Sequence, residues 1–116
     1  MTSRGLGRSL WGAMFTDSSP TASRTHRVSD IALLERVAAG DGRALWELSA
    51  RHAISLRALA FGILHDAVAA EQVVQATFRE VRYEAARFDP AHFPVFGWLE
   101  ELTRVGALQY ARVRAG

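Results

Sequence analysis

Apolar residues recur at helical spacing along most of the chain after residue 28. The clearest run lies between residues 67 and 87, where steps of four and three place one apolar stripe along a helix. This stripe comprises Val74, Phe78, Val81, Ala85 and Phe88. The opposite, polar face comprises Glu71, Gln72, Gln75, Arg79 and Arg82. The pattern predicts an amphipathic helix that ends before Pro90, because proline disfavours helical geometry in the residue before it.

Three further helices are predicted from caps and spacing. Ser29 or Asp30 can cap a first helix that Gly40 ends, and Asp41 can cap a second helix over about residues 42–64. A last helix begins at Pro94, a residue suited to a first turn, and runs to about residue 113. The residues expected to be buried are Ile31, Leu34, Val37 and Ala38 on the first helix, Leu45, Leu48, His52, Leu56, Leu59 and Ile63 on the second, and Trp98, Leu99, Leu102, Val105 and Leu108 on the last.

The predicted fold class is all-α, a compact bundle of about four short helices. No window shows the alternation of a strand, and 116 residues with 49% hydrophobic content suffice for one small domain, placed at residues 29–116. Residues 1–28 are rich in Ser, Thr, Gly and Arg and show no sustained period. We expect them to form a disordered arm, with docking on a partner through Trp11 and Phe15 as the alternative.

The composition argues against several kinds of chemistry. The chain has no cysteine, which excludes disulfides and thiolate metal sites and agrees with a reducing cytoplasm. It has no glycine-rich phosphate loop, zinc-binding His-Glu-x-x-His helix or nucleophile elbow, and its four histidines lack ligand spacing. No stretch approaches the ~18 apolar residues of a membrane span. We therefore expect a cytoplasmic protein that is not an enzyme, without metal, cofactor or membrane contact.

Arginine is the only strongly basic residue of the chain. All 14 basic residues are arginine, as expected of a GC-rich bacterial genome, and arginine pairs with phosphate and stacks on bases. The net charge is only +2, so any DNA contact needs local clustering. In the loop over residues 89–97, Phe93 and Phe96 offer rings that could stack on unpaired bases or could close the core beside Trp98. Both alternatives stay open.

Several segments together resemble region 2 of the extracytoplasmic-function sigma factors of bacterial RNA polymerase. They are residues 37–45, 71–81, 86–90 and 98–114, with Trp98, Leu99, Arg104, Arg112 and Arg114 matching the family pattern of the last helix. The resemblance implies binding to core RNA polymerase, at the clamp coiled coil of its largest subunit, through Glu71, Gln72, Gln75 and Arg79. It also implies binding to single-stranded promoter DNA of the −10 element through His92, Phe93, Phe96, Arg104, Gln109, Arg112 and Arg114.

Several positions depart from the family pattern. Gln72 and Ala76 stand where acids are usual, and Val105 and Gln109 replace an asparagine and an aspartate. Glu100 and Glu101 add negative charge that repels phosphate, so we expect weak DNA binding. The chain holds no counterpart of region 4, the helix-turn-helix that reads the −35 element, so we expect no recognition of a two-part promoter by this chain alone.

Two alternatives follow from these departures. The first is a degenerate sigma-like regulator that binds polymerase, an anti-sigma factor or another protein without reading promoter DNA. The second is a helical interaction module with no role in transcription.

Overall fold

The computed structural model describes residues 28–116, which form four α-helices and one short 3-10 helix and contain no strand. The elements are α1 (Asp30–Ala38), α2 (Gly42–Leu64), α3 (Ala67–Glu84), η1 (Ala85–Arg87) and α4 (Val95–Ala115). The predicted all-α class is confirmed. The arm predicted at residues 1–28 lies, apart from Val28, outside the described residues. No helix within residues 28–116 is long and apolar enough to cross a membrane.

Side-chain caps set the starts of the first three helices. The Ser29 hydroxyl accepts a hydrogen bond from the Ala32 amide at 3.1 Å, which decides between the two predicted caps of α1. Asp41 accepts from two amides at the start of α2, and Asp66 accepts from the Ala69 amide at 3.0 Å at the start of α3. Between α1 and α2, Gly40 adopts a φ of +97°, a conformation that side-chain-bearing residues rarely take.

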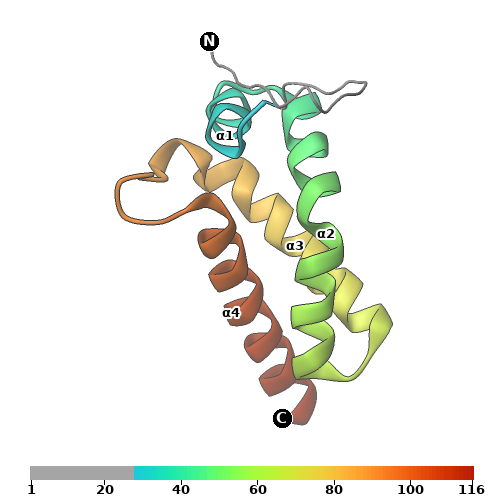
Figure 1. The fold of residues 1–116 in the computed structure, drawn as a ribbon. Helices are drawn as coiled ribbons and strands as arrows, with labels where there is room; N and C mark the ends of the chain where they lie inside the picture. Colours follow the sequence, from blue (N-terminus) through green and yellow to red (C-terminus); the bar gives the residue numbers. More distant parts are fainter. Residues whose placement is uncertain (1–27) are drawn as a thin grey trace, which may run out of the picture.

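Helices α2, α3 and α4 pack against one another, and α1 lies across the end of the bundle at which α2 begins and α3 ends (Figure 1). The main core lies between α1 and the other three helices. It includes Leu33, Leu34, Val37, Leu48, Leu56, Val74, Phe78, Val81 and Leu99. A second cluster lies near the turn between α2 and α3 and includes Ala60, Leu64, Ala69, Ala70, Val73 and Ala107. Its small side chains let the three long helices approach closely.

The expected apolar faces are confirmed for α3 and are partly wrong elsewhere. Four of the five predicted α3 residues are buried and Phe88 is half-buried. On α4 the buried residues are Val95, Leu99, Thr103 and Ala107, whereas Val105 and Leu108 are 44% and 49% exposed. The reason is that α4 packs against both α2 and α3, so the tight contact selects small side chains spaced by four.

The two N-terminal helices need smaller corrections. On α1, Leu33 is buried, while Ile31 and Ala38 are exposed. On α2, Leu48 and Leu56 are buried as expected. The remaining predicted residues of α2, Leu45, His52, Leu59 and Ile63, are only half-buried. Ala44, Ala60 and Leu64 are buried as well. The reason is that α2 contacts α1, α3 and α4, so its buried surface is wider than the single predicted stripe.

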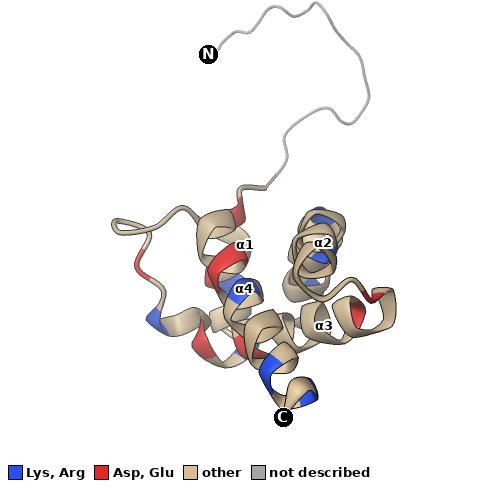
Figure 2. Ribbon diagram, turned by 90° about the horizontal axis from the view of Figure 1, so that it is seen from below, with Lys and Arg blue, Asp and Glu red and all other residues tan. Residues whose placement is uncertain are grey.

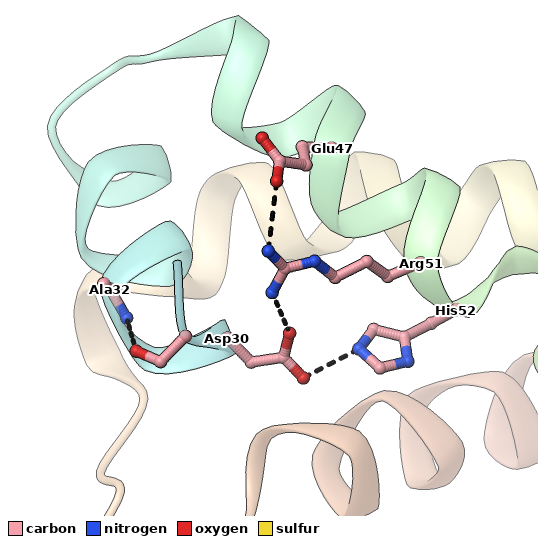
Figure 3. Close-up of polar contacts among 6 residues, drawn as sticks. Asp30, Ala32, Glu47, Arg51 and His52 are labelled. Carbon is pink, nitrogen blue, oxygen red and sulfur yellow. Dashed lines mark hydrogen bonds and ion pairs between the residues drawn. The ribbon is translucent and has the colours of Figure 1, made fainter. Parts of the chain in front are cut away.

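A polar cluster joins α1 to α2 (Figure 3). The Asp30 carboxylate accepts from Arg51 at 3.0 Å and lies 2.7 Å from Nε2 of His52, and Arg51 also donates to Glu47 at 3.0 Å. The Arg51 side chain is only 10% exposed, so its guanidinium needs these two carboxylates to compensate for its loss of hydration. The His52 ring lies 5.1 Å from the Phe96 ring, which extends the connection to the start of α4.

Candidate partner-binding surfaces

The four residues predicted to bind polymerase lie together on the outer face of α3. Gln72, Gln75 and Arg79 are exposed, and Glu71 is half-buried. The opposite face of the same helix is committed to the core. The amphipathic pattern of the sequence therefore keeps these four side chains out of the hydrophobic core.

Contacts with neighbouring helices modify the charge of this face. The Glu71 carboxylate accepts from Arg57 of α2 at 3.0 Å and from the Gln75 amide at 3.1 Å. The Gln72 side-chain oxygen accepts from the Tyr110 hydroxyl of α4 at 3.2 Å. Arg79 forms no ion pair within residues 28–116. The negative charge of Glu71 is thus balanced by Arg57, and the positive charge of Arg79 is left in excess.

Grooves run along both sides of α3. The groove between α3 and α4 has a volume of about 790 Å³, and Ala76, Gly106 and Tyr110 are among its lining residues. The groove between α2 and α3 has a volume of about 470 Å³ and is lined partly by Leu45, Trp46 and Phe78. Gln75 and Arg79 border both grooves, so a partner lying along α3 would meet these two side chains first.

The seven residues predicted to bind DNA extend along the whole of α4 and the loop before it. α4 has 21 residues, which corresponds to a length of about 31 Å. His92 and Phe93 precede one end of this helix, and Arg112 and Arg114 lie at the other. On α4 the acids Glu100 and Glu101 come before the arginines Arg104, Arg112 and Arg114, so negative and positive charge occupy different parts of the helix (Figure 2). The seven residues therefore do not gather in one cluster.

The two aromatic residues predicted in one loop occupy different environments, because α4 begins at Val95 and therefore includes Phe96. Phe93 is 51% exposed, whereas Phe96 is half-buried against His52 and the main core. His92 is exposed, and its Nδ1 lies 2.7 Å from the Asp89 carboxylate. Phe96 therefore packs against the core, which is one of the two predicted alternatives. Phe93 is exposed and remains accessible to a ligand.

The candidate phosphate-binding arginines are partly engaged within the domain. Arg104 donates to Glu101 at 2.8 Å. Arg114 donates to the Leu64 carbonyl at 3.1 Å and to Asp66 at 3.2 Å, so it fastens the end of α4 to the turn between α2 and α3. Arg112 is exposed and forms no ion pair with any residue from 28 to 116. Exposed pairs contribute about 0–1 kcal/mol, so exchanging Glu101 for a phosphate costs Arg104 little.

Gln109 is exposed and lines the groove between α3 and α4. Sequence reasoning missed two other surface residues, Trp46 and Arg57 on α2, and it named Arg82 only as part of the polar face of the third helix. A signal for Trp46 was present in the sequence, because a large aromatic residue stands beside the apolar stripe of α2 rather than within it. Nothing in the sequence placed Trp46 and Arg57 beside Arg82, since Arg82 comes from another helix.

In residues 28–116 no group of three or more His, Cys, Asp or Glu side chains could hold a metal ion. No family model matches the chain, and comparisons with curated proteins and with solved structures found no match. The resemblance to sigma region 2 therefore rests on the residues quoted from the sequence.

Proposed function

We propose that residues 29–116 form a sigma region 2-like domain that binds core RNA polymerase through the outer face of α3. The observation that carries this proposal is that Glu71, Gln72, Gln75 and Arg79 all lie on one accessible side of a single helix. In the family that this sequence resembles, the corresponding helix contacts the clamp coiled coil of the largest subunit. We assign the same role to α3.

The surroundings of α3 suit a helical partner. An α-helix laid alongside α3 would enter one of the two grooves and meet Gln75 and Arg79, which border both. Glu71 would exchange its pair with Arg57 for a contact to the partner. Both side chains of this pair are about two-fifths exposed, with values of 42% and 43%, so the exchange costs little.

Reading of single-stranded −10 DNA is the second part of the proposal. It is supported by the exposed ring of Phe93 and the exposed charge of Arg112. Stacking on one ring contributes about 1–3 kcal/mol per base. The core position of Phe96 and the ion pair of Arg104 leave few other contacts, so DNA binding is weak.

The alternative is a sigma-like regulator that binds polymerase or an anti-sigma factor without reading promoter DNA. Docking through α3 is common to both functions. The charge distribution of α4 is what favours this alternative, because Glu100 and Glu101 lie near any phosphate that reaches Arg104.

A pull-down of purified core polymerase tests the docking claim. The Glu71→Ala, Gln75→Ala variant removes two contacts and should retain less polymerase than the wild type. A control variant, Glu101→Ala, removes an acid of α4 that lines neither groove, and Arg104→Ala combined with it keeps the number of substitutions equal; this variant should retain as much as the wild type. Equal recovery with all three proteins, at equal helical circular dichroism, would show that α3 is not the docking surface.

A further inference from the structure

The groove between α2 and α3 combines an apolar floor with a basic rim. Leu45, Ala53 and Phe78 line its floor, and the arginines Arg57, Arg79 and Arg82 surround it. Its volume of about 470 Å³ is sufficient for one or two side chains of a partner.

Positive charge on this rim is only partly balanced. Arg57 is paired with Glu71, the one acidic residue that lines the groove. Arg79 and Arg82 are exposed, and neither forms an ion pair with another residue between 28 and 116. They are three positions apart on α3, so both project to the same side of the helix. Three arginines thus face a single carboxylate, and a negatively charged ligand would relieve their repulsion.

Trp46 lines the same groove from α2. Its side chain is 72% exposed, although a large aromatic ring normally gains from burial. Exposed tryptophan and arginine are the residues most often responsible for binding energy in protein interfaces. An apolar side chain of a partner could occupy the floor beside Trp46 while its acidic neighbours meet the arginines.

We propose that the groove between α2 and α3 binds an acidic segment of a partner protein that carries an apolar anchor residue. The anchor packs between Trp46 and Phe78, and carboxylates pair with Arg79 and Arg82. Charge excludes the first 27 residues of this chain as the occupant, because they carry Arg4, Arg8, Arg24 and Arg27 against one acidic residue, Asp17. Single-stranded nucleic acid fits less well, since successive bases need several rings and the groove offers one exposed aromatic side chain beside a glutamate.

The inference goes beyond the proposed polymerase contact, although the two surfaces share Arg79 and the groove between α2 and α3. Trp46 and Arg82 are not among the four residues assigned to polymerase docking. Variants of these two residues therefore test the groove while leaving Glu71, Gln72, Gln75 and Arg79 intact.

The experiment measures binding of a fluorescein-labelled synthetic peptide by fluorescence anisotropy. The peptide carries glutamates around a leucine and a phenylalanine, and its matched control has glutamine in place of every glutamate. We expect the acidic peptide to bind the full chain and the neutral peptide to bind at least about tenfold more weakly, with affinity falling as salt rises. Trp46→Ala should weaken binding by more than about tenfold, as for an interface anchor. Arg82→Gln should weaken it by up to about fivefold, as for one exposed ion pair.

Arg112→Gln is the matched control, since it removes an exposed, unpaired arginine of the described domain from α4 rather than from the groove. It should leave peptide affinity unchanged. Equal weakening by Arg112→Gln and Arg82→Gln would mean that the peptide binds by overall charge, which overturns the proposal. Absence of binding, equal binding of the neutral peptide, or tighter binding of a labelled oligothymidine than of the acidic peptide would overturn it as well.

Discussion

The hydroxyl oxygens of Thr77 on α3 and Thr103 on α4 lie 3.1 Å apart, and both side chains are buried. Thr77 also donates to the Val73 carbonyl at 3.1 Å. A hydroxyl has a single hydrogen to donate, so Thr103 is the donor within the pair. This hydrogen bond fixes how α4 lies against α3, whose outer face carries the proposed polymerase contact.

The direction of this hydrogen bond predicts unequal effects of two valine substitutions. Thr77→Val leaves the Thr103 hydroxyl as a buried donor without its acceptor and should lower the free energy of unfolding by about 1–3 kcal/mol. Thr103→Val should cost less, because Thr77 keeps its bond to Val73. The double variant should cost less than the sum, since it leaves no unpaired hydroxyl. Urea denaturation measures all three values. Equal losses for the two single variants would contradict the assigned direction, and strictly additive losses would contradict the coupling of the two hydroxyls.

The same pair shows what sequence reasoning could predict about α3 and α4 and what it could not. On α3 the steps between Val74, Phe78 and Val81 identified the largest core residues, but they did not predict the burial of Val73 and Thr77. α4 is covered by α2 and α3 together, and the close contact buries Thr103 and Ala107 in place of larger residues. Hydropathy alone does not reveal such a contact, because the burial of Thr103 is favourable only through its hydrogen bond to Thr77, and that residue lies on another helix.

For the candidate site too, the sequence predicted arrangements within one helix but not arrangements that join two helices. Residues within one helix, such as Gln75 and Arg79, could be placed on a common face from their spacing. The groove that contains Trp46 and Arg82 depends on how two helices cross, and the Asp30 cluster joins positions that are 22 apart in the sequence. Spacing along a single helix carries no information about either arrangement.

Acid should remove the contribution of Asp41 to stability. The pKa of this carboxyl lies below its ordinary value of 3.8, first because it accepts from the Ala44 amide and next because of Arg36. A lowered pKa means that the contribution is complete above the unfolded pKa and disappears as the pH falls through the folded one. Asp41→Asn should therefore be less stable than the wild type at neutral pH, and the two should converge in acid. A difference that stays constant across an acid titration of urea midpoints would contradict this account.

Substitution of Phe93, in the loop before α4, should affect DNA binding, whereas substitution of Phe96, in the first turn of α4, should affect stability. Phe93→Ala should weaken binding to a −10-like single strand by the loss of a stacking contact, about 1–3 kcal/mol, with little change in melting temperature. Phe96→Ala should lower the melting temperature, because its ring packs on His52 and the core. Fluorescence anisotropy measures the DNA affinity of both variants, and thermal circular dichroism measures their melting temperatures. Unfolding by Phe93→Ala, or unchanged stability of Phe96→Ala, would contradict the placement of the rings.

The acid pair of α4 should limit DNA affinity. Glu100→Gln with Glu101→Gln removes repulsion of phosphate and frees Arg104 from its pair with Glu101. Single-strand binding should tighten, more at low salt than at high salt because ions screen the effect, and the single strand should bind better than the duplex. Anisotropy at two salt concentrations tests this. If neither protein binds at low salt, the regulator that does not read DNA becomes the better account.

Competition for purified core RNA polymerase tests the central claim most directly. The measurement is a biosensor titration of purified bacterial core polymerase with the full chain, repeated in the presence of a sigma factor that binds the same polymerase. We predict saturable binding that the sigma factor displaces, and a dissociation constant that rises about tenfold, equivalent to about 1.4 kcal/mol, for Glu71→Ala with Gln75→Ala but not for Glu101→Ala with Arg104→Ala. No binding, or binding that the sigma factor does not displace, would contradict the assignment of this domain as a sigma region 2-like polymerase ligand.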